Sequence, residues 1–109
     1  MLALTACATL PPPTAELAAA DQAVTRAGTA DADQYAADEF AQARRALAQA
    51  QSAMAAGRDT DARSLALQAS SGADLAAARS REATANAELS RRYAEITDLK
   101  RRLQLEGQP

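Results

Sequence analysis

The sequence predicts an all-α fold, either an antiparallel helical hairpin or a three-helix arrangement with a long, projecting, coiled-coil-like C-terminal helix. Of the 109 residues, 32 are alanine, the best helix former. The strand-forming residues Val, Ile, Phe, Trp and Tyr together number five. Apolar residues also recur at spacings of three and four, the period of one helix face. The chain has room for one domain, which we place at residues 14–106.

The first helix is expected at about residues 14–27. Thr14 is placed to cap it, and Glu16 lies in its first turn, where an acid favours the helix dipole. Gly28 is a natural helix terminator. The apolar face of this helix is expected to comprise Leu17, Ala20, Val24 and Ala27.

The second helix is expected at about residues 34–56 and has the clearest periodicity. Asp38 and Glu39 lie in its opening turn. Its predicted apolar face comprises Phe40, Ala43, Leu47, Ala50 and Met54.

A tight turn at Gly57-Arg58-Asp59 is expected to separate the second helix from a third at about residues 60–105, with Gly57 left-handed and Asp59 or Thr60 as the next cap. Short connections make antiparallel neighbours. The second helix would span roughly 35 Å and the third roughly 70 Å. The second half of the third helix therefore has no partner within the chain, and Gly72 marks a place where it could kink.

That second half carries a rough heptad stripe that predicts an interaction surface. The stripe comprises Ala85, Leu89, Tyr93, Ile96, Leu99 or Lys100, and Leu103. Self-association or a protein partner would bury it. The alternative is a lone charged helix that frays, because three heptads are near the minimum for a coiled coil.

The N-terminus resembles a bacterial lipobox. Leu4-Thr5-Ala6 precedes Cys7, as in a lipoprotein cleavage site that leaves cysteine as the first mature residue and acceptor of lipid. Residues 1–6 would be a truncated signal-peptide remnant, and residues 7–13 a lipidated, proline-rich tether. We expect an outer-membrane anchor facing the periplasm. The alternative is that Cys7 is an ordinary small residue in a cytoplasmic protein.

The sequence lacks the residue types that metal binding and most kinds of catalysis require. The chain has no histidine and one cysteine, so we expect no metal, no cofactor and no enzymatic activity. The pairs Asp31/Asp33 and Asp59/Asp61 flank turns, where aspartate caps helices. The net charge of −2, without aromatic residues among the C-terminal bases, argues against nucleic acid. No small-molecule substrate is expected.

Cys7, the prolines and the run Tyr35-Ala36-Ala37-Asp38-Glu39-Phe40 through Gly57-Arg58-Asp59 to Ala69 resemble a bacterial lipoprotein family catalogued as domain of unknown function 4398. The resemblance covers roughly residues 7–79. Members often have proline where this chain has Ala37. The resemblance implies a small α-helical envelope lipoprotein and supplies no catalytic residues. Larger relatives carry an OmpA-like peptidoglycan-binding domain that is absent from this sequence.

The predicted function is therefore a structural or protein-interaction role. A competing hypothesis is a periplasmic peptide-binding adaptor with one tetratricopeptide-like repeat, although a single repeat cannot bury its own face. A third hypothesis places the C-terminal helix on a second membrane through its arginines, although Glu88, Glu95 and Asp98 weaken that attraction.

Overall fold

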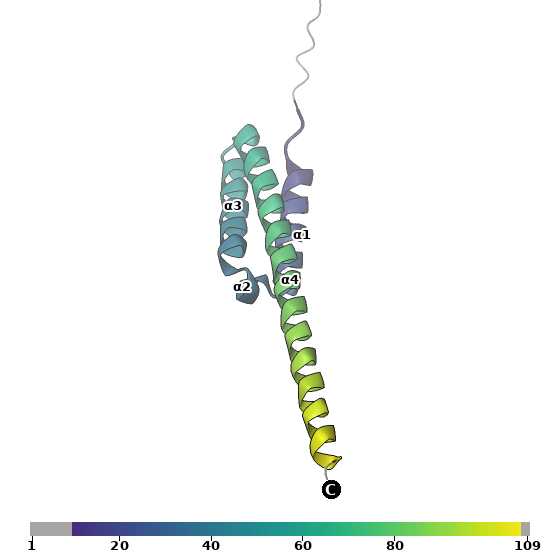
Figure 1. Ribbon diagram of the computed structural model, residues 1–109. Coiled ribbons are helices and arrows are strands. Elements are labelled where there is room, and N and C mark those ends of the chain that lie inside the picture. The colour runs from purple at the N-terminus through teal and green to yellow at the C-terminus, as the bar shows by residue number, and fades with distance from the viewer. Residues whose placement is uncertain (1–9, 108–109) are drawn as a thin grey trace, which may run out of the picture.

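The computed structural model describes residues 10–107, and these residues form four helices and no strand. The helices are α1 (Thr14–Thr29), α2 (Ala32–Tyr35), α3 (Ala37–Ala55) and α4 (Asp59–Glu106). Figure 1 shows α1 and α3 beside the first half of α4, whereas the second half of α4 extends alone. The predicted all-α fold with a long projecting C-terminal helix is confirmed.

The three long helices form one bundle in which α1 and α4 run parallel and α3 runs antiparallel to both (Figure 1). At one end, Arg63 near the start of α4 donates a hydrogen bond of 2.5 Å to the Pro11 carbonyl, just before α1. At the other end, Arg79 of α4 forms an ion pair with Glu39 near the start of α3. The start of α4 thus lies beside the start of α1 and the end of α3.

The core of this bundle consists almost entirely of alanine. Sixteen apolar residues are buried, and all except Leu47 are alanine. Alanine lets helix axes approach closely while each side chain buries little area. Four larger side chains pack against the edges of these buried alanines and are only partly buried. They are Leu17, Val24, Phe40 and Leu65. The expectation that Leu17, Val24, Phe40 and Met54 would belong to the buried faces is therefore only half right.

Along α4, the buried positions follow a heptad pattern, with steps of four and three. They are Ala62, Ala66, Ala69, Ala73, Ala76, Ala77 and Ser80. Gly72 lies against α3, where a Cβ would lie 3.4 Å from the Ala43 Cβ. The helix continues through Gly72 without a break. The glycine thus accommodates a close contact and does not interrupt the helix.

The helix boundaries differ from expectation around the first connection. Gly28 does not end α1, which continues to Thr29, because Gly28 faces the Phe40 ring and has no positive φ. The single helix expected at 34–56 is divided at Ala36, whose φ of −144° and ψ of 48° are not helical. Before it, Asp31 adopts a left-handed conformation with φ of 60°. The short α2 lies between Asp31 and Ala36, the two residues whose backbone is not in the right-handed helical conformation.

The predicted capping side chains do not cap. Pro13 and Arg58, not Thr14, Asp59 or Thr60, occupy the N-cap positions of α1 and α4, and no side-chain cap bond forms at any of the four described helices. Asp59 and Asp61 instead lie in the first turn of α4, where their charge favours the helix dipole. The predicted left-handed Gly57 is confirmed, with φ of 75°.

Candidate interaction surface

The predicted site residues fall in two places. Cys7 lies outside the described residues 10–107, so its lipidation stays a prediction. The predicted stripe residues all lie on α4, beyond the end of the bundle. We define the outer stripe as Leu89, Tyr93, Ile96, Leu99 and Leu103.

The bundle ends at Ser80, the last buried residue of α4. Its hydroxyl donates a hydrogen bond to the Ala30 carbonyl, just after α1. From Ala85 onward, all the described residues are exposed except Glu88 and Asp98, which are half-exposed. We define residues 85–106 as the projecting segment, which is roughly 33 Å long at 1.5 Å per residue. No part of the described chain covers it.

The side chains of the outer stripe are between 48% and 67% exposed. At 100° per residue, Leu89, Tyr93, Ile96 and Leu103 point within about 40° of the direction opposite to Ser80. Leu99 lies at the margin of the same face. The outer stripe therefore does not continue the face that packs on α1 and α3. It lies on the back of the helix, facing away from the bundle.

Beside the outer stripe, two acids are paired with arginines of the same helix. Glu88 accepts hydrogen bonds from Arg91 at 2.5 Å and Arg92 at 3.0 Å. These two bonds lower the pKa of Glu88, and the Arg91 bond also raises the pKa of Arg91. Asp98 likewise forms ion pairs with Arg101 at 2.5 Å and Arg102 at 2.9 Å. Such pairs at three and four residues support an isolated helix.

Three charged side chains of the projecting segment differ from these. Within the described part of the chain, Glu95, Lys100 and Glu106 take part in no ion pair. Glu95 and Lys100 are exposed and lie five residues apart. At 100° per residue, Lys100 points within about 20° of the direction opposite to Ser80, whereas Glu95 points about 120° from that direction, beyond Leu99. A positive charge thus lies on the face of the outer stripe, and a negative charge lies on its flank.

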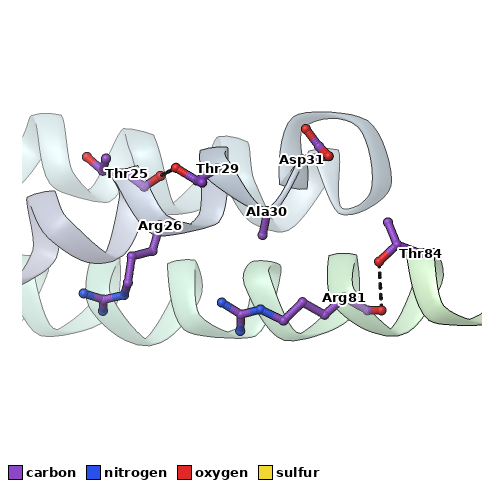
Figure 2. Close-up of a pocket in the computed structure, with 7 residues that line it drawn as sticks. All are labelled: Thr25, Arg26, Thr29, Ala30, Asp31, Arg81 and Thr84. Atoms are coloured by element: carbon purple, nitrogen blue, oxygen red, sulfur yellow. Dashed lines mark hydrogen bonds between the residues drawn. The ribbon is translucent and has the colours of Figure 1, made fainter.

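A surface hollow lies where the bundle ends, and Figure 2 shows the residues that line it. They are Thr25, Arg26, Thr29, Ala30, Asp31, Arg81 and Thr84. The threonine hydroxyls all donate to backbone carbonyls of their own helices. The charged residues of the lining are Arg26, Arg81 and Asp31. Arg26 also forms an ion pair of 3.6 Å with Asp74. This arrangement offers neither a nucleophile with a base nor a uniform field for an anion.

Residues 10–107 also lack two other kinds of site. They contain no group of three or more His, Cys, Asp or Glu side chains placed to hold a metal ion. None of their helices combines the length and the apolar character that crossing a membrane requires.

The sequence identified the apolar residues of the outer stripe but not the direction they face. The available signal was the alanine heptad from Ala62 to Ser80, which defines the packed face. Counting at 100° per residue from Ser80 places Leu89 on the opposite face. The absence of an ion pair at Glu95 was visible only in the structure, because Arg91 and Arg92 lie four and three residues before it. For Lys100 the sequence already indicated it, since no acid lies three or four residues away.

In a comparison with protein families, the model described as Domain of unknown function (DUF4398) matches residues 15–99. This range includes nearly all of the bundle and much of the projecting segment, and it extends beyond the expected end at residue 79. Comparisons with curated proteins and with solved structures give no match.

Proposed function

This chain belongs to the family described as Domain of unknown function (DUF4398), and we propose that it is a non-enzymatic lipoprotein of the bacterial envelope with a structural or protein-interaction role. In this proposal, Cys7 holds the protein at a membrane and the projecting segment presents the outer stripe to a protein.

The observation that carries the interaction role is the outer stripe itself. The bundle buries little apolar area, because fifteen of its sixteen buried apolar residues are alanine. Yet five large apolar side chains are about half exposed on one side of a segment that does not pack on the bundle. Exposed apolar surface gathered on one face is typical of a protein interface. A protein that covers this face would explain why these residues are gathered there.

The arrangement of the helices supports an anchor at the N-terminal end. Leu10 and Pro11 lie beside the start of α4, where Arg63 binds the Pro11 carbonyl. An acyl group on Cys7, three residues before Leu10, would hold this end of the bundle near the bilayer. The 48 residues of α4 span roughly 72 Å. The projecting segment would then extend away from the membrane surface, towards partners in the periplasm.

The packing of α1 favours this role over a tetratricopeptide-like adaptor. An adaptor would use the inner face of the α3–α4 hairpin to hold a peptide. In this structure α1 covers that face, with Ala20, Ala23 and Ala27 at most 1% exposed. A peptide would have to displace α1 before it could bind there.

The anchor is tested by intact mass and membrane fractionation of the protein, tagged at its C-terminus and expressed from its own gene. We expect membrane association and a mass that matches acylation at Cys7. The control is Cys7→Ala, which should be neither acylated nor retained in the membrane fraction. An unmodified protein that fractionates with soluble proteins would contradict the proposal.

A further inference from the structure

We propose that the outer stripe is the seam of a parallel, two-stranded coiled coil between two copies of this chain. This inference names the partner of the proposed function, and it rests on that function for the shared membrane attachment. The charges, the sequence register and the position of the bundle each support it.

The outer stripe has the register of a heptad repeat. Leu89, Ile96 and Leu103 are seven residues apart and take position a. Ala85 and Leu99 take position d, and Tyr93, the remaining residue of the outer stripe, takes position e beside the seam. A β-branched residue at a with leucine at d, as at Ile96 and Leu99, favours two parallel strands. This register is distinct from that of the buried alanines, so one helix carries two seams on nearly opposite faces.

The unpaired charges specify a parallel orientation. In the stripe register Glu95 takes position g and Lys100 takes position e of the next heptad. In a parallel pair, position g of one helix lies beside the following position e of the other. Glu95 of each copy would therefore meet Lys100 of the second copy, and neither of these side chains forms an ion pair within the described part of the single chain.

An antiparallel pair fits the same charges less well. With the stripes fully overlapped, Glu95 would lie beside Glu95 of the second copy, which is repulsive. The attractive contact in that arrangement would join Glu88 to Arg102, and both already have partners in their own helix. Antiparallel pairing would also place the two N-terminal ends at opposite ends of the assembly. A parallel pair leaves both ends on the same side, where one membrane can hold them.

The bundle does not obstruct a parallel pair. At 100° per residue, Leu89, Ile96 and Leu103 point about 140–180° from Ser80, the last buried residue of α4, so each bundle would lie on the outside of the assembly. Before Ala85, the next position a is Glu82, which is exposed. Two copies of Glu82 would repel each other, so the seam begins at Ala85 and includes only the projecting segment.

Arg92 takes position d within the seam and limits its strength. Its Nε donates to Glu88 at 3.0 Å, and Glu88 takes position g on the margin of the seam. A polar residue at one core position fixes register at a cost in stability. With about three heptads and one arginine, the pair should be weak in solution. Two anchors in one membrane raise the effective concentration and would strengthen it.

The test is sedimentation equilibrium of the full chain carrying Cys7→Ala, so that neither lipid nor a disulfide contributes. We expect a concentration-dependent monomer–dimer equilibrium. Glu95→Lys or Lys100→Glu alone should weaken association about tenfold, because two ion pairs become two repulsions. The variant that carries both substitutions should associate with an affinity within about threefold of that of the chain without them. Ala94→Lys, on the opposite face, is the matched control and should have little effect.

Circular dichroism of each variant would show that the bundle remains folded. A chain that stays monomeric at every concentration, or single exchanges that the double exchange does not rescue, would overturn the coiled coil. The mass of the Cys7 protein reports on anchoring independently. A monomeric but acylated protein would thus refute this inference alone, whereas an unacylated protein would refute the proposed anchor.

Discussion

Replacing Gly72 with alanine is expected to raise the free energy of unfolding by about 0.5–1 kcal/mol. Glycine inside a helix is less favourable than alanine by about 0.8–1.0 kcal/mol. The new Cβ would lie 3.4 Å from the Ala43 Cβ and 3.7 Å from the Ala43 Cα, which is ordinary van der Waals contact. The gain in helix propensity should therefore survive. For a domain of this size it corresponds to a rise of about 2–8 °C in Tm.

The assay is thermal and urea unfolding followed by far-ultraviolet circular dichroism, with the full chain carrying Cys7→Ala as reference. Gly57→Ala is the matched control. Nothing lies within 4 Å of a Cβ at Gly57, but its φ of 75° is unfavourable for alanine. That variant should lose about 1 kcal/mol. A lower Tm for Gly72→Ala would refute the reasoning, because it would mean that the added methyl group does not fit between α3 and α4.

Three further predictions concern the bundle and the projecting segment. Ser80→Ala should lower the free energy of unfolding by about 1–3 kcal/mol in urea titrations, because the Ala30 carbonyl loses its buried donor; exposed Ser90→Ala should not. Ala69→Leu should lower it by about 1–3 kcal/mol in the same assay, because Ala69 is 0% exposed and has no room for larger groups; an unchanged midpoint would contradict close packing. The pKa of Glu88 lies below its ordinary 4.5 when the segment is folded, so its stabilisation is present above pH 4.5 and lost as pH falls through the lowered pKa. Carbon chemical shifts of the projecting segment should report that loss of helix, and the Glu88→Gln variant should not show it.

The alanine-rich sequence was sufficient to predict helices but not which side chains they bury. Phe40 and Leu17 have the spacing of core residues, yet both are only partly buried. The reason is that alanines such as Ala43 and Ala69 bring the helix axes so close that the seam has no space for large groups. Apolar periodicity alone does not distinguish a narrow seam flanked by large residues from a wide one filled by them.

The break at Ala36 had no signal in this chain's own residues, although a proline at the position of Ala37, frequent in the family it resembles, would favour a helix start there. No proline or glycine lies between Asp31 and Phe40, so local propensity favours one continuous helix. The structure places Ala32 and Ala36 in the core, at 0% and 4% exposure. Tertiary packing of these two alanines against the end of the bundle therefore overrides the helical preference.

The projecting part of α4 was predictable because it depends on length alone. The unequal lengths of the second and third predicted helices left one of them without a partner beyond the bundle. The direction of its apolar face was not predicted, since it is defined only relative to the packed face. Once Ser80 is known to be buried, the opposite orientation of Leu89 follows from helix geometry.

Cysteine pairing within the projecting segment tests the central claim most directly. Ala85→Cys places a thiol at position d of the outer stripe, and Ala87→Cys places one two residues later on the opposite face; both positions are exposed. In the full chain with Cys7→Ala, a parallel pair predicts rapid disulfide formation between two copies of the Ala85 variant and little for the Ala87 variant. Equal rates for both variants, or no disulfide through position 85, would contradict parallel pairing through the outer stripe.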